Sequence, residues 1–177
     1  MGHSLGANVA LEMVASGAFE GPVVLLSPSL SREDESKFPR ALDVLSRILG
    51  HLPYSLMLRL IGPAMKSSLP PARREALIAD LRNNDPRFLR RQVRGYLAYL
   101  DRHGSLASRL GAADVPTWIV FGERDDIGIT DDERNALAEH PHVRIIEIAN
   151  ARHFTLNEQP GQIAELLLDA LGSESPR

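Results

Sequence analysis

The chain has 177 residues, of which 44% are hydrophobic and 24% charged, a composition typical of one globular domain that buries a core. A formal net charge of -3 with dispersed basic residues argues against nucleic-acid binding, and no apolar run approaches the ~20 residues that span a bilayer. The absence of cysteine excludes disulfides, thiolate catalysis and Cys-ligated zinc. We therefore expect no nucleic-acid partner, no membrane span and a cytoplasmic location.

The first segments predict a helix followed by a strand. Residues 5–16 place apolar side chains on one side of a helix, and Gly17 is a typical C-cap. Residues 22–28 form a short, β-branched apolar run, which is typical of a strand buried on both faces. This order is half of a βαβ unit and indicates an α/β fold.

The middle of the chain, residues 31–110, has helical patterns and no convincing strand. Four helices are expected, around residues 41–49, 54–65, 72–81 and 87–100. Four arginines recur at helical spacing in the last of them, which is typical of a solvated face. They are Arg87, Arg90, Arg91 and Arg94. This region is therefore predicted to be a helical insertion.

The α/β pattern then resumes. Residues 116–122 and 143–148 predict two further buried strands, and residues 130–133 carry a capping-box signature for the helix between them. A last helix is expected over residues 160–171. Since helices separate the strands, the sheet should be parallel, with about three strands, flanking helices and the helical insertion.

A G-x-S-x-G motif, Gly2-His3-Ser4-Leu5-Gly6, opens the first predicted helix, which is the setting of a nucleophile elbow. Gly2 and Gly6 would let backbone segments approach closely, so that Ser4 can occupy a strained turn. The N–H of Leu5 would be a donor for an oxyanion. The same pattern also fits Ser4 as an ordinary helix N-cap, and the motif alone leaves both interpretations open.

A serine nucleophile needs a base, and the base needs an orienting carboxylate. Asp125 and Asp126 follow the predicted strand that ends at Phe121, and His153 follows the strand over residues 143–148. Parallel strands would bring these side chains to the carboxyl edge of the sheet. Each alone also fits a turn-forming acid or a surface histidine, but the order Ser, Asp, His favours one triad.

Three motifs in chain order resemble those of the α/β-hydrolase superfamily. They are the elbow Gly2-His3-Ser4-Leu5-Gly6-Ala7, the acid turn Gly122-Glu123-Arg124-Asp125, and the histidine loop His153-Phe154 with Glu158-Gln159-Pro160. The resemblance assigns the acid to Asp125 rather than Asp126. It implies a triad of Ser4, Asp125 and His153, an oxyanion donor at Leu5, and no metal or organic cofactor.

The resemblance also implies a domain organisation. Residues 1–30 and 111–172 would form the C-terminal half of the hydrolase core, residues 31–110 a helical cap, and residues 173–177 a tail. Family members have several strands before the serine, whereas three residues precede Ser4 here. We expect a partial α/β-hydrolase fold that begins at the elbow, is inactive as this fragment, and self-associates through an open sheet edge.

The function that the resemblance implies is a serine hydrolase acting on a small-molecule ester or related acyl substrate. A serine nucleophile argues against haloalkane dehalogenases and epoxide hydrolases, whereas acyltransferase, C–C bond hydrolase and perhydrolase chemistry stay open. Five apolar residues at helical spacing in the insertion fit either an acyl pocket or plain packing. They are Leu56, Met57, Leu60, Ile61 and Met65. The alternative is a non-catalytic remnant or binding module of the same fold.

Overall fold

The computed structural model describes residues 1–64 and 69–172, which divide into two compact units. The α/β unit combines the segment up to Glu35 with the segment from His103 onward. The helical unit covers Ser36–Arg102. Met65 and the expected tail over residues 173–177 lie outside the described residues.

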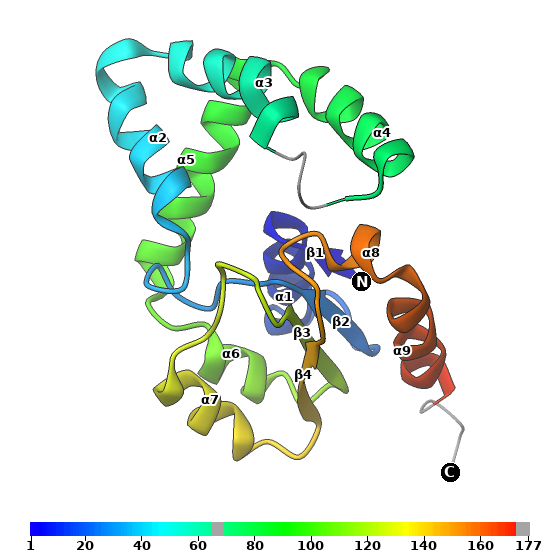
Figure 1. Cartoon of the computed structure of the whole chain (residues 1–177). Helices are drawn as coiled ribbons and strands as arrows, with labels where there is room; N and C mark the ends of the chain where they lie inside the picture. Colours follow the sequence, from blue (N-terminus) through cyan, green and yellow to red (C-terminus); the bar gives the residue numbers. More distant parts are fainter. Residues whose placement is uncertain (65–68, 173–177) are drawn as a thin grey trace. The chain divides into compact units, whose positions relative to one another are not determined.

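A parallel sheet with the strand order β1-β2-β3-β4 is the centre of the α/β unit (Figure 1). Its strands are β1 (Gly2–His3), β2 (Val23–Leu26), β3 (Thr117–Gly122) and β4 (Val143–Ile148). The three expected strands form, and the two-residue β1 adds a fourth beside Leu25 and Leu26 of β2. The predicted α/β fold with a parallel sheet and flanking helices is confirmed.

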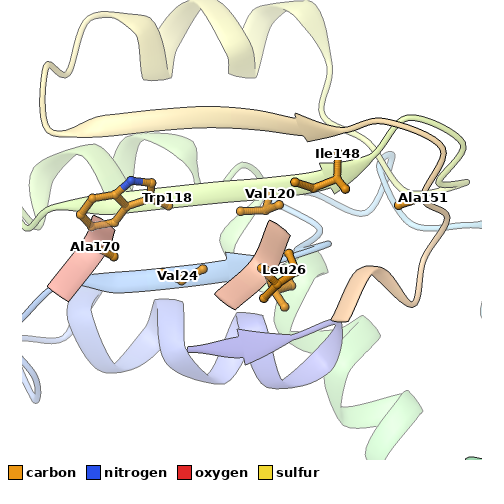
Figure 2. Packing of buried hydrophobic residues seen from close by; sticks show 8 residues of the cluster. Val24, Leu26, Trp118, Val120, Ile148, Ala151 and Ala170 are labelled. Carbon is orange, nitrogen blue, oxygen red and sulfur yellow. The ribbon is translucent and has the colours of Figure 1, made fainter. Parts of the chain in front are cut away.

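Helices cover both faces of this sheet because its central strands are apolar on both sides. The helices of the α/β unit are α1 (Leu5–Ala15), α6 (Ala107–Ala112), α7 (Asp131–Ala138), α8 (Thr155–Glu158) and α9 (Pro160–Gly172). Alternate residues of β2 and β3 pack with Ile163 and Ala170 of α9 in the cluster that Figure 2 shows. On the other side, α1 contacts β1, β2 and α6.

Local sequence signals account for where several of these helices begin. At the start of α7 the predicted capping box forms, since Thr130 Oγ1 accepts from Glu133 N at 3.3 Å and Glu133 Oε2 accepts from Thr130 N at 3.1 Å. The short helices α6 and α8 were not expected. They have six and four residues, too few for an apolar period to be recognised.

The helical unit contains the four expected helices with longer bounds. They are α2 (Lys37–Leu49), α3 (Leu52–Ala64), α4 (Pro71–Arg82) and α5 (Pro86–His103), the last of which ends at the unit boundary. Three of the arginines of α5 that were expected to form a solvated face are exposed and Arg90 is partly buried, but two of the four also bond to other side chains of the unit. Arg94 Nε donates to the buried Asp43 Oδ1 at 3.1 Å, and Arg90 Nε donates to Ser46 Oγ at 3.2 Å.

A helix that spans a membrane must be long and apolar enough to cross its hydrocarbon core. None within residues 1–64 and 69–172 is long and apolar enough to cross a bilayer. The cytoplasmic location stays a prediction.

Candidate active site

Ser4 occupies a strained turn between β1 and α1. Its backbone has φ 52° and ψ -124°, a conformation that favours glycine, and its N–H donates to Leu26 O at 2.8 Å. Although Ser4 stands at the N-cap position of α1, its side chain makes no capping hydrogen bond. The hydroxyl is therefore not engaged as an N-cap, and the interpretation of Ser4 as an ordinary cap is wrong.

The glycine that makes this turn possible is Gly2. A Cβ at this position would overlap the carbonyl of Gly6 and the backbone nitrogen of Ala7, so only glycine fits without a backbone shift. A Cβ at Gly6 would meet nothing within 4 Å. A close backbone approach was expected at both glycines. It excludes a side chain at Gly2 but not at Gly6.

The N–H of Leu5 lies in the first turn of α1, where backbone N–H groups have no partner within the helix. The first helical bonds are those from Ala7 N and Asn8 N to Ser4 O, at 2.8 and 3.3 Å. Within the described part of the chain, no acceptor lies opposite Leu5 N. This donor next to Ser4 is available to an oxyanion.

Asp125 and His153 form a hydrogen-bonded pair at the carboxyl edge of the sheet. His153 Nδ1 lies 3.2 Å from Asp125 Oδ1 and 3.4 Å from Oδ2. The Asp125 side chain is 1% exposed and the His153 side chain 28% exposed. Only the imidazole of this pair is therefore open to a substrate.

Asp125 is held as an anion in spite of its burial. Burial alone would raise its pKa, but hydrogen bonds from His153, Ser27 and the N–H of Ile127 outweigh this effect, so the pKa of Asp125 lies below its ordinary value. Ser27 Oγ donates at 2.6 Å and Ile127 N at 3.0 Å. Because the ionised carboxylate can only accept, the proton of neutral His153 resides on Nδ1, which leaves Nε2 as the basic nitrogen.

Backbone contacts fix the loop that carries His153 against the acid turn. Arg124 N donates to Ala151 O at 2.9 Å, and Glu123 N donates to Ile148 O at 3.0 Å. A Cβ at Gly122 would collide with the carbonyl of Ala151, so a glycine at the end of β3 lets the two loops approach. The acid and the histidine are thus supported by two elements that are bonded to each other.

The structure joins the predicted site residues in part. The Asp125–His153 pair forms, and His3, the neighbour of Ser4, lies 2.7 Å from the His153 carbonyl through Nε2. Among the described residues, no hydrogen bond joins the Ser4 hydroxyl to His153. Catalytic hydrogen bonds are often long in proteins without substrate. The pairing of Ser4 with His153 as nucleophile and base therefore stays a prediction.

Two contributors to this site were missed from the sequence, His3 and Ser27. Ser27 follows β2 directly and lies at the same sheet edge as Asp125. This position after a strand could have identified Ser27 as a site residue from the sequence. Its backbone has φ 50°, a second strained serine at a strand end. By contrast, Asp126, the rival acid, is exposed.

In residues 1–64 and 69–172, no group of three or more His, Asp or Glu side chains is arranged to hold an ion.

A separate apolar groove lies within the helical unit. It has a volume of about 440 Å³ between α2 and α3. Its lining residues are Phe38, Leu42, Leu45, Pro53, Leu56, Met57, Leu60 and Ile61. Leu56 and Leu60 are 57% and 56% exposed, so they are not buried core residues. Four of the five apolar residues identified in the sequence therefore face a groove, and the fifth is Met65.

Comparison with known proteins identifies the family. The model of the alpha/beta hydrolase family matches residues 1–166. This chain belongs to that family. No curated protein matches it in sequence.

Solved structures share the fold at low identity. MenH from S. aureus aligns with a TM-score of 0.73 and 20% identity, covering 99% of this chain and 68% of that one. A hydrolase from Pseudomonas aeruginosa has a TM-score of 0.68 and 21% identity, covering 97% and 63%. A thermophilic esterase from Thermogutta terrifontis has a TM-score of 0.71 and 16% identity, covering 97% and 63%. The chain spans about two thirds of the length of these structures.

Proposed function

We propose that the chain carries the nucleophile, base and acid of a serine hydrolase acting on an ester or related acyl substrate. Ser4 would be the nucleophile, His153 the base and Asp125 the acid. The observation that carries the proposal is the Asp125–His153 hydrogen bond at the sheet edge where the strained Ser4 also lies. Family membership supports the same class of reaction.

In this proposal His153 Nε2 accepts the hydroxyl proton as Ser4 Oγ attacks the acyl carbon. Asp125 holds the proton on Nδ1 and stabilises the imidazolium that forms. The free N–H of Leu5 donates to the developing oxyanion. His153 then returns the proton to the leaving group, and the acyl-enzyme is hydrolysed by the same pair acting on water.

We also propose that the helical unit acts as a cap. The apolar groove of this unit then indicates the substrate class. A groove of about 440 Å³ has the size of ordinary small-ligand sites and is lined by aliphatic and aromatic side chains. An aliphatic acyl group matches this lining. We accordingly propose aliphatic esters ahead of charged or sugar esters.

The test is covalent labelling by a fluorophosphonate, which reacts with activated serines, combined with hydrolysis of p-nitrophenyl butyrate, in the 177-residue chain and in a product that includes any in-frame codons upstream of Met1. Ser4→Ala should abolish the label at that residue and lower kcat by about three to six powers of ten, because a triad nucleophile is removed. Ser16→Ala is the matched control, since Ser16 ends the helix that Ser4 begins. Unchanged turnover in Ser4→Ala would remove Ser4 from the mechanism.

The second candidate is a non-catalytic remnant or binding module of the same fold. It is favoured by one observation, the lack of a hydrogen bond from the Ser4 hydroxyl to His153 within the described residues. Labelling is therefore compared between the 177-residue chain and a product that includes any in-frame codons upstream of Met1. Reaction of Ser4 in either form favours the enzyme, and no reaction in both favours the remnant.

We also propose self-association through β1 and β2. β1 pairs only with Leu25 and Leu26, so Val23 and Val24 have a strand partner on one side alone among the described residues. Light scattering of the purified chain should show dimers or larger species. A monomer at all concentrations would contradict this part of the proposal.

A further inference from the structure

His3 connects the elbow to the loop that carries the histidine. It is the last residue of β1 and directly precedes Ser4. Its Nε2 lies 2.7 Å from the main-chain oxygen of His153, 150 residues further along the chain. A carbonyl oxygen only accepts, so His3 Nε2 carries the proton and donates it.

The rings around this hydrogen bond form a compact cluster. The centroids of His3 and His153 are 4.9 Å apart, with Phe154 at 5.8 Å from His3 and 5.5 Å from His153. His153 and Phe154 meet edge to face. The imidazole of His153 is thus bounded by Asp125 at Nδ1 and by two rings that limit its rotation.

Burial determines the protonation state of His3. It lowers the pKa of the His3 imidazole below the ordinary value, and the bond to the His153 carbonyl only partly opposes this effect. At neutral pH the ring is therefore neutral, with its proton on Nε2. A neutral ring can lie against His153 when that residue takes up a proton, whereas a second cation would repel it.

We infer that His3 is a positioning residue for His153, holding the histidine loop through its hydrogen bond to the main-chain oxygen of His153. The inference rests on the proposed function, in which His153 is the base. His3 touches neither substrate nor the reacting proton. Its effect passes through the orientation of His153 relative to Asp125 and Ser4.

Two substitutions separate the donor from the ring. His3→Phe fills the same space but removes the hydrogen bond, whereas His3→Gln loses the ring and keeps an N–H donor at a similar reach. His51→Phe in the helical unit is the matched control for a histidine-to-phenylalanine change elsewhere. If His3→Phe fails to fold, His3→Asn replaces it, because its amide is too short to reach the carbonyl.

The deciding measurement is the tautomer of His153, read from its ring ¹⁵N shifts in the 177-residue chain, which requires no turnover. The parent, His3→Gln and His51→Phe should show the proton on Nδ1. In His3→Phe the released loop should lengthen the bond from Nδ1 to Asp125, so that Asp125 no longer fixes the tautomer and a mixture of both tautomers appears. An unchanged tautomer in His3→Phe overturns the inference, whatever the activity.

Turnover of p-nitrophenyl butyrate provides a second, independent reading. In His3→Phe, kcat should fall by about 10- to 100-fold with KM unchanged, and His3→Gln should recover most of it. A merely structural role would instead lower thermal stability and leave the kcat of the folded fraction unchanged. If no variant turns over substrate, including the parent and its product with any in-frame codons upstream of Met1, while the tautomer still responds to His3, the proposed function fails and the positioning role stands.

Discussion

The two units of the molecule differ in how they accommodate a buried carboxyl group. The pKa of Asp34 in the α/β unit is raised, whereas the pKa of Asp43 in the helical unit is lowered. Asp34, in the α/β unit, is 8% exposed and lies beside another buried acid, Glu133. Burial, and next the charge of Glu133, raise the pKa of Asp34 to about 7. Asp43, in the helical unit, is 3% exposed and bonds to Arg94 and Arg47.

The arginines reverse the effect of burial at Asp43. Burial alone would raise the pKa of Asp43, but the hydrogen bonds from Arg94 and Arg47 hold it below its ordinary value. The helical unit thus neutralises its buried charge. In the α/β unit, by contrast, Asp34 accepts the N–H groups of Leu30 and Ser31, at 2.7 and 2.8 Å, and these bonds do not offset its burial and the charge of Glu133.

Backbone strain is divided between the units in the same way. All four described non-glycine residues with positive φ lie in the α/β unit, namely Ser4, Ser27, Asp114 and Asn150. Ser4 and Ser27 stand at the ends of β1 and β2. The neighbour of Ser4, His3, bonds to the His153 carbonyl, and the Ser27 side chain bonds to Asp125. Strain of about 1–3 kcal/mol per residue persists only where the surroundings enforce it, and it clusters at functional sites. Two of the four strained residues, Ser4 and Ser27, therefore lie where the chemistry is proposed.

The largest effect expected is on activity, from the acid of the α/β unit. Asp125→Asn should lower kcat on p-nitrophenyl butyrate by about 10⁴-fold, because an amide favours the wrong tautomer of His153. Asp126→Asn is the matched control and should leave kcat unchanged, since Asp126 is exposed. Loss of turnover in Asp126→Asn alone would show that the acid was assigned to the wrong residue.

The next effect concerns the elbow glycines. Gly2→Ala should lower the free energy of unfolding by about 1–3 kcal/mol, because its Cβ would collide with the Gly6 carbonyl and backbone cannot move aside cheaply. Gly6→Ala should be neutral or stabilising by up to about 1 kcal/mol, since the position is open and helical. Urea denaturation of both variants is the measurement. Equal destabilisation would contradict the view that only Gly2 is sterically restricted.

The two buried carboxyls should make the free energy of unfolding depend on pH in different ways. The pKa of Asp34 is raised from 3.8 to about 7 on folding, so its contribution is complete below pH 3.8 and is lost as the pH rises towards 7. Replacing it by Asn, which keeps an acceptor for Leu30 and Ser31, should remove that loss. The advantage of Asp34→Asn over the parent should therefore grow between pH 5 and pH 7, by at most about 1.4 kcal/mol per pH unit.

Asp43→Asn is the control for this pH dependence. The pKa of Asp43 is lowered from 3.8, so its stabilisation is present above that pH and is lost only in acid. Between pH 5 and pH 8 the deficit of Asp43→Asn should hence stay constant. Urea denaturation across this range decides the matter, and a constant difference for Asp34→Asn as well would mean that Asp34 is already ionised.

Much of the candidate site could be predicted because it follows local patterns. The apolar runs that became β2, β3 and β4 are recognisable without tertiary information, and parallel strands bring their carboxyl ends to one edge. Asp125 and His153 come directly after such ends, so their pairing could be expected. β1 could not be predicted, because two residues carry no pattern.

Contacts between distant segments could not be predicted in this way. The bond from Arg94 to Asp43 joins residues 51 apart, and the spacing of the arginines on α5 carries no information about an acid on α2. The bond from His3 to the His153 carbonyl joins residues 150 apart and uses a main-chain acceptor that every residue has. The charges and the apolar period of a segment predict the structure of that segment alone. These contacts instead depend on how two separate elements pack against each other.

The smallest effect is expected on the outer surface of the helical unit, where Ile48 of α2 is 85% exposed. Ile48→Ser should change the free energy of unfolding by less than about 0.5 kcal/mol, because the side chain is in water and the two residues have similar helix propensity. Leu97→Ala on α5, where Leu97 is 2% exposed, should cost about 2–5 kcal/mol. Thermal or urea denaturation distinguishes the two. A large loss in Ile48→Ser would mean that this apolar surface is covered in solution.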